Sequence, residues 1–347
     1  MQDEIAAGVV EAVKARLAPG QKVLPRRPAA RNLEAYRAYL RGRHLRGKED
    51  HAGALQAFEE AVRLDPSHAP SWTGLAEITV LSAVFSAMLP REACGAARRA
   101  LETAAALQGE SSEGWHVEAF ACWIERRWEA MEVAWRRALE LEPTHVLALG
   151  SFAISLCTCQ RLEEALPFFE CAREADPLAS FPYALTGCGY LTCGRPHEAE
   201  RHLEDALSFE NEDVTALYCL AVAKVALGKV EEGIAQAERA VTVSHRGGVL
   251  VGVLGWALAT SGRSAEARAL LGELRARPAG SPTVVAEAWL LGALGEKDAA
   301  FEVLGRAEDE CQANLYFTGL PVFDPLRGDP RFTALLQRLG LPNEGLP

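Results

Sequence analysis

Residues 146–177 read VLALGSFAISLCTCQRLEEALPFFECAREADP and carry the pattern that decides the fold. Small and large apolar residues recur at helical spacing in two stretches, and Asp176-Pro177 ends the unit. The key positions are Phe152, Ala153, Ala165, Phe169 and Ala172. The pattern returns after about 34 residues, at Gly187, Tyr190, Ala199, Leu203 and Ala206. A fixed period of that length predicts an array of stacked helical hairpins.

The chain divides into four regions by pattern and composition. Residues 33–310 hold seven clear copies of the repeat and one weaker copy, so we expect an array of seven to eight repeats. Residues 1–18 predict an N-terminal helix, a possible remnant of a preceding domain, and residues 19–32 predict a linker containing Pro and Arg. Residues 311–347 predict a C-terminal cap and tail, because an open array needs apolar side chains over its last face. Those side chains are expected to be Phe323, Leu326, Phe332, Leu335 and Leu336.

The repeat units resemble the tetratricopeptide repeat (TPR) family over about residues 33–307. The weak eighth copy departs from the family pattern at Glu287, where an apolar residue is usual. The resemblance implies an all-α, right-handed superhelix of antiparallel helix pairs with a C-terminal capping helix. It also implies binding of protein segments on the concave face. Co-chaperone members clamp a terminal carboxylate with Lys, Arg and Asn, but the matching positions here are apolar or small, so that activity is not implied.

The two ends of the chain resemble the repeat region of bacterial TolB-like/TPR regulators. QDEIA at residues 2–6 is similar to the last helix of a TolB-like domain. LEAY at 33–36 and YLRGR at 39–43 resemble the segment that joins such a domain to repeats, and FDPLRGDPRF at 323–332 resembles the tail. This resemblance implies a relative of transcription regulators, kinases or adenylate cyclases that lacks their effector domain.

Composition limits the partners and the compartment. A net charge of −11 over 347 residues argues against holding a phosphate backbone, so no nucleic-acid partner is expected. Nine cysteines without a framework spacing predict reduced thiols in the cytoplasm. The start lacks the basic region of a signal peptide. The longest uncharged stretches, 146–160 and 247–262, are too short to predict a membrane span, and the excess of Arg over Lys suggests a bacterial genome.

The sequence contains no pattern that predicts catalysis. Cys157-Thr158-Cys159 could be a metal or redox pair, but a zinc site needs further ligands at recognisable spacing, so buried thiols at helix crossings are favoured. His116 and Glu118 lie two residues apart and face different ways on a helix. There is no HExxH, phosphate-binding glycine loop or nucleophile elbow. We therefore expect no enzyme activity, no metal and no cofactor.

The positions that packing leaves free carry the functional prediction. Trp115 and Trp135 fit packing positions, whereas Trp128 is expected in a loop. Trp123 falls on the helix face that lines the family's concave groove, and Glu77 occupies an equivalent position earlier in the array. The positions that face this groove form a row along the array, here called the aromatic row. The row is rich in aromatic residues, which are enriched where partners dock. The predicted partner-binding residues are His116, Phe120, Trp123, Tyr218, Trp256 and Trp289.

The expected function is that of a non-catalytic scaffold in bacterial signalling or regulation, which captures a partner peptide or helix in this apolar groove. The groove could instead be filled by the chain itself, through tight closure of the superhelix or by the N-terminal helix. Two other functions stay open. One is a regulatory small-molecule-binding or sensor domain near Trp123 and Tyr218, and the other is an assembly factor that uses its convex face and edges and self-associates.

Overall fold

The computed structural model describes residues 32–48, 50–85, 90–277 and 283–342. All regular secondary structure in these ranges is helical, so the predicted all-α solenoid is confirmed. The predicted N-terminal helix at 1–18 lies outside the described residues, as do the linker up to residue 31 and the last residues, 343–347.

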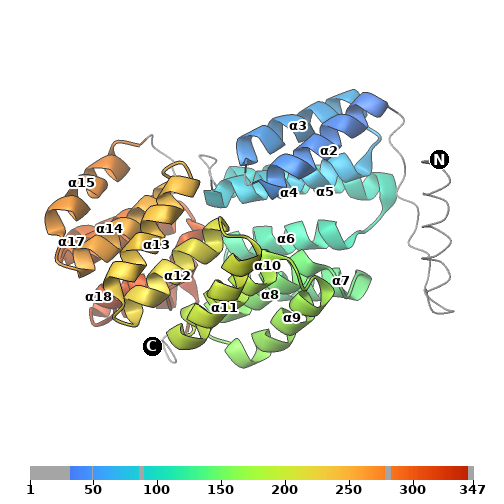
Figure 1. Ribbon diagram of the computed structural model, residues 1–347. Helices are drawn as coiled ribbons and strands as arrows, with labels where there is room; N and C mark the ends of the chain where they lie inside the picture. The colour runs from blue at the N-terminus through green and yellow to red at the C-terminus, as the bar shows by residue number, and fades with distance from the viewer. Residues whose placement is uncertain (1–31, 49, 86–89, 278–282, 343–347) are drawn as a thin grey trace, which may run out of the picture.

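Eight helix pairs follow one another in the described part of the chain, and Figure 1 shows them stacked along a curved path. They are α2 (Leu33–Gly47) with α3 (His51–Leu64), α4 (Ala69–Phe85) with α5 (Pro90–Gln108), α6 (Ser112–Ile124) with α7 (Trp128–Leu141), α8 (Val146–Thr158) with α9 (Leu162–Ala175), α10 (Ser180–Thr192) with α11 (Pro196–Phe209), α12 (Val214–Ala226) with α13 (Val230–Val243), α14 (Gly248–Thr260) with α15 (Ser264–Arg275), and α16 (Val284–Ala293) with α17 (Lys297–Asp309).

The two helices of a pair approach closely because small residues lie where they cross. A Cβ at Gly187 of α10 would lie 2.5 Å from Cγ of Leu203 in α11, so only glycine fits there. Gly194 follows the end of α10 with a φ of 72°, a left-handed conformation that glycine adopts without strain. Phe152 and Phe169 are fully buried between the helices. Truncating such a side chain typically costs about 3–5 kcal/mol, so packing holds the pairs together.

The hydrophobic core formed by the described residues has two parts. A continuous cluster runs from Ala76 in α4 to Leu341 at the end of the described chain. A smaller cluster around Tyr39 and Phe58 holds the first helix pair. None of the helices in the described residues is long and apolar enough to cross a membrane.

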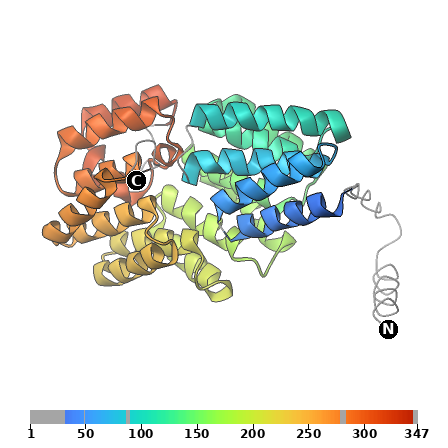
Figure 2. The same ribbon diagram turned by 90° about the horizontal axis from the view of Figure 1, so that it is seen from above.

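The tail segment, residues 311–341, forms two short 3₁₀ helices and two α-helices. They are η1 (Ala313–Tyr316), η2 (Pro321–Phe323), α18 (Asp324–Arg327) and α19 (Pro330–Leu339). The predicted cap is confirmed, because the Phe323 ring packs against Trp289 of α16 at 5.9 Å and all five predicted capping side chains are buried. The tail segment also reaches beyond the last pair. The hydroxyl of Tyr316 in this segment donates a hydrogen bond to the backbone oxygen of Ile124 at the end of α6. Figure 2 shows the stacked pairs from above.

Candidate binding surface

The six predicted partner-binding residues all lie on the first helices of their pairs. Four of them are buried, and they are His116, Trp123, Trp256 and Trp289. Phe120 and Tyr218 are half-buried. The burial of Trp123 and Trp289, which are 4% and 2% exposed, has one common cause. The tail segment lies on both of them.

Trp123 of α6 is enclosed by two aromatic residues of the tail segment. The ring of Tyr316 meets it edge to face, with 5.3 Å between centroids, and the ring of Phe317 lies at 5.8 Å. The hydroxyl of Tyr316 donates a hydrogen bond of 2.6 Å to the backbone oxygen of Ile124, the last residue of α6. Residues 192 positions apart in sequence are therefore joined inside the core.

A second contact attaches the end of the tail segment to α7. Trp128, which was expected in a loop, is the first residue of α7 because the helix starts directly after a short turn. Its indole N–H donates to the backbone oxygen of Leu339 at 3.1 Å, and its ring packs against Tyr316 at 5.5 Å. Arg126 lies 3.9 Å from Glu308 of α17. The third pair and the last pair therefore meet, and the superhelix closes on itself.

Between these contacts the tail segment passes the end of α10. Gly319 lies so close to the backbone oxygen of Thr192 that a Cβ there would be 1.7 Å from it. Deeper in the row, burial and the neighbouring thiols of Cys188 and Cys219 raise the pKa of Tyr218. The C-terminal tail therefore covers the aromatic part of the concave surface at Trp123, at the end of α10 and at Trp289.

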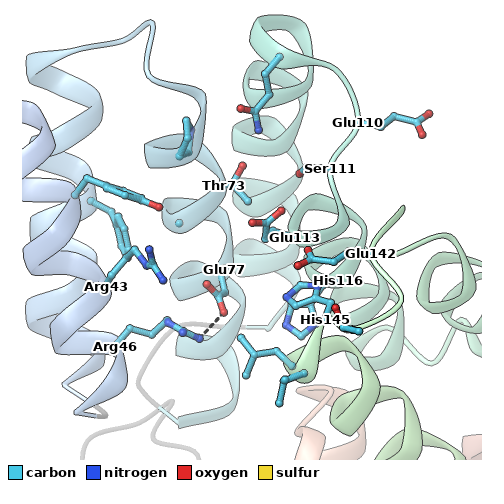
Figure 3. Close-up of a pocket in the computed structure, with 18 residues that line it drawn as sticks. Arg43, Arg46, Thr73, Glu77, Glu110, Ser111, Glu113, His116, Glu142 and His145 are labelled. Atoms are coloured by element: carbon cyan, nitrogen blue, oxygen red, sulfur yellow. Dashed lines mark hydrogen bonds and ion pairs between the residues drawn. The ribbon is translucent and has the colours of Figure 1, made fainter. Parts of the chain in front are cut away.

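The N-terminal part of the concave surface is different, because it contains a polar cavity of about 630 Å³. Figure 3 shows its walls, with α2 and α4 on one side and α6 and the connection between α7 and α8 on the other. The charged and polar side chains that line it include Arg43, Arg46, Thr73, Glu77, Glu110, Ser111, Glu113, His116, Glu142 and His145. Two of the row positions found in the sequence, Glu77 and His116, therefore face a hollow rather than the tail.

Ionic and histidine contacts organise this polar cavity. Arg46 pairs with Glu77 at 2.7 Å, and burial raises the pKa of Glu77 although Arg46 opposes the shift. Burial, together with His145 and Arg46, lowers the pKa of His116 well below its usual value. The His116 ring packs against Trp135 at 5.0 Å, and its Nδ1 has no hydrogen-bond partner among the described residues. His116 is therefore a buried imidazole in the wall of the cavity.

Sequence reasoning missed most of the cavity residues. Arg43 and Arg46 are three residues apart on α2, and this spacing on one helix face was the available signal. Glu113 lies one turn before His116 on α6, which was a second signal. Glu142 and His145 come from a connection between helices, for which the repeat pattern makes no prediction.

The comparisons with known proteins bear on the fold. No protein-family model matches the chain, and no curated protein matches it. Among solved structures, human IFIT1, solved as a dimer with PPP-AAAA, is 17% identical, with a TM-score of 0.53 over 91% of this chain and 85% of that chain. A tetratricopeptide repeat protein from Parabacteroides merdae is 15% identical, with a TM-score of 0.49 over 79% of this chain and 98% of that chain.

A third solved structure is YrrB, described as a TPR protein with an unusual peptide-binding site. It is 21% identical, with a TM-score of 0.33 over 53% of this chain and 90% of that chain. The stacked helix pairs share their fold with the IFIT1 structure, whose TM-score is above 0.5. The fold is a TPR solenoid. The resemblance of the two ends of this TPR solenoid to TolB-like regulators stays a prediction.

Proposed function

We propose that this TPR solenoid is a non-catalytic scaffold that binds a segment of a partner protein on its concave surface, in bacterial cytoplasmic signalling or regulation. The binding residues proposed are His116, Phe120, Trp123, Tyr218, Trp256 and Trp289. One observation carries the proposal. The aromatic row already holds a polypeptide segment in irregular, 3₁₀-containing conformation, namely the tail segment from Ala313 to Phe323.

The way the row holds its own tail suggests how a partner would bind. Aromatic pairs contribute about 0.5–1.5 kcal/mol each beyond the area they bury. A partner segment with aromatic side chains could make the contacts that Tyr316 and Phe317 make with Trp123. Phe120 and Tyr218 keep part of their surface exposed, so a partner would meet them first. Contact with Trp123 or Trp289 requires the tail segment to move.

The net charge of −11 supports a protein partner over a nucleic acid, because phosphate backbones are held by basic faces.

A small-molecule sensor is the second candidate. It is favoured by the size of the polar cavity, since 630 Å³ lies within the usual range for small-ligand sites. A metabolite that stays bound in native mass spectrometry would favour the sensor over the scaffold.

Peptide display on the full-length chain tests the proposal. A library of random decapeptides is selected against the wild type, and the affinities of enriched peptides are then measured by fluorescence anisotropy. The variant Phe120→Ala/Tyr218→Ala should bind them about thirtyfold more weakly, since each half-buried aromatic contributes about 1 kcal/mol to such contacts. Both side chains are half-buried, so circular dichroism should show unchanged helicity.

The matched control is Val133→Ala/Leu178→Ala, which removes two exposed apolar side chains outside the row. It should bind the selected peptides as the wild type does. Failure to enrich any peptide, or equal affinity of the Phe120→Ala/Tyr218→Ala variant and the control, would refute the proposal.

A further inference from the structure

The two ends of the helical array differ in how they are covered. At the C-terminal end the tail segment lies on α16, where a Cβ at Gly292 would be 3.1 Å from Cγ of Leu326. At the start of the array, which is blue in Figure 1, α2 exposes Leu33, Tyr36 and Leu40, with exposed fractions of 62%, 39% and 44%. Their spacing of i, i+3 and i+7 places them along one face of the helix, here called the α2 face.

Comparison with α10 shows which part of the repeat the α2 face represents. A Cβ at Gly42 of α2 would lie 2.9 Å from the ring of Phe58 in α3. A Cβ at Gly187 of α10 would lie 2.5 Å from Leu203 in α11. The two glycines therefore hold the same place in their pairs, each at the crossing with the second helix. The residues six and two positions before them correspond, and they are Tyr36 with Phe181 and Leu40 with Leu185.

In α10 these two positions contact the first helix of the preceding pair. A Cβ at Gly150 of α8 would lie 2.9 Å from Leu185 and 3.2 Å from the ring of Phe181, so both side chains pack closely over α8. The α2 face is thus a face to which a helix docks in the rest of the array. A helix that covers it should carry a small residue at the crossing, as α8 does at Gly150.

We propose that residues 1–18 of the same chain cover the α2 face as a helix. The sequence of these residues, which lie outside the described ranges, is MQDEIAAGVVEAVKARLA. Ile5, Gly8, Val9 and Ala12 follow the i, i+3, i+4 and i+7 spacing of one helix face. Gly8 lies within that face and supplies the small residue that the crossing with Tyr36 and Leu40 needs.

The length of the chain allows this contact. A helix of 18 residues is about 27 Å long, and the 15 residues of α2 span about 22 Å. Residues 19–32 can extend over about 46 Å, which is enough to bring residues 1–18 alongside α2 in either direction.

Charge favours the contact only slightly. Residues 1–18 hold three acidic and two basic side chains, whereas α2 holds four arginines and one glutamate. Two of these arginines, Arg41 and Arg46, already pair with Glu60 and Glu77. Burial of the apolar side chains on both helices is therefore the main stabilising contribution.

Photo-crosslinking of the full-length chain tests this placement. The amino acid p-benzoylphenylalanine replaces Leu40, whose exposed side chain leaves room for an aromatic group, and the cross-links formed on irradiation are mapped by mass spectrometry. The main product should join position 40 to residues 1–18 and should migrate as a monomer on a denaturing gel. The same probe in place of Leu178, which is 76% exposed between α9 and α10, should give no cross-link to residues 1–18.

Hydrogen exchange of α2 gives a second readout that needs no probe. In the variant Ile5→Ser/Val9→Ser, peptides covering residues 33–47 should exchange about tenfold faster than in the wild type, because two apolar side chains no longer hold the covering helix. The yield of the cross-link from position 40 should fall in the same variant. The matched control Ala7→Ser/Val10→Ser changes the opposite side of the same helix and should behave as the wild type does.

The other results would overturn the inference. A covalent dimer formed from position 40 would assign the α2 face to a second copy of the chain. Absence of any cross-link to residues 1–18 would mean that they lie elsewhere. Equal exchange of α2 in the wild type and in Ile5→Ser/Val9→Ser would mean that these side chains do not contact it. None of these readouts involves Phe120 or Tyr218, so the outcome is independent of the proposed function.

Discussion

The two parts of the concave surface are built from the same repeat but have opposite properties. From the third pair onward, Trp123 and Trp289 are covered by the tail segment and belong to the core. In the first three pairs, equivalent positions hold Glu77 and His116, and a polar cavity lies in front of them. The repeat therefore fixes where a side chain projects, whereas the chemistry of that side chain decides whether the groove is filled or left hollow.

Substitution of Trp123 by Ala should have the largest effect, because it removes a ring packed against Tyr316 and Phe317. We expect the free energy of unfolding to fall by about 3–5 kcal/mol. On the polar side, Glu142→Gln at an exposed position should change it by less than about 0.5 kcal/mol. Urea unfolding followed by circular dichroism measures both. Similar losses of unfolding free energy in the two variants would contradict the difference between the tail-covered aromatic region and the polar cavity.

Substitution of Gly319 by Ala should loosen the tail segment. The added Cβ cannot fit 1.7 Å from the Thr192 oxygen, so we expect a loss of about 1–3 kcal/mol in unfolding free energy. The control is Gly328→Ala, where a Cβ meets nothing within 4 Å. Thermal unfolding of both proteins gives the comparison, and a Gly319→Ala protein as stable as the control would place the tail elsewhere.

The free energy of unfolding should depend on pH through His116, which lies in the wall of the polar cavity. Burial holds the pKa of His116 below its usual 6.5, so the unfolded chain binds the proton more readily. Stability from this group is present above about pH 6.5 and is lost as pH falls, by at most about 1.4 kcal/mol per pH unit. Urea titrations at pH 7 and 5 measure how far the free energy of unfolding falls between the two pH values. The fall should be smaller in His116→Gln than in the wild type. Equal losses would mean that His116 is solvated.

Substitution of Tyr316 by Phe should have the smallest effect on the filled side. The ring contacts with Trp123 and Trp128 stay, while the hydrogen bond to the Ile124 oxygen is lost. We expect a loss of about 1–1.5 kcal/mol in unfolding free energy. A loss equal to that of Trp123→Ala would show that the hydroxyl, rather than aromatic packing, holds the tail segment.

The sequence predicted the helix pairs because their packing is local. Residues such as Phe169 and Ala172 repeat at a fixed period, and each pair needs only its neighbours to bury them. The capping role of Phe323 and Leu326 was predictable for the same reason, since an open array must cover its last face.

The position of the tail segment could not be predicted in this way. Tyr316 meets Ile124 across 192 residues, and that contact depends on the rotation summed over many pairs. The polar cavity depends on the same summed geometry, which brings Arg46 of α2 and His145 beside α8 to one hollow. Arg43 and Arg46 alone look like ordinary solvent-exposed residues of a helix. The resemblance to TolB-like regulators at the two ends stays a prediction.

Hydrogen exchange of the full-length chain, read by mass spectrometry, tests the contrast between the two regions most directly. Amides of the tail segment such as Leu315, Leu320 and Phe323 donate to backbone oxygens inside the filled groove. The account predicts that peptides covering residues 313–323 exchange as slowly as those from α10 and α12. Complete exchange of residues 313–323 within seconds, while α10 and α12 stay protected, would contradict it.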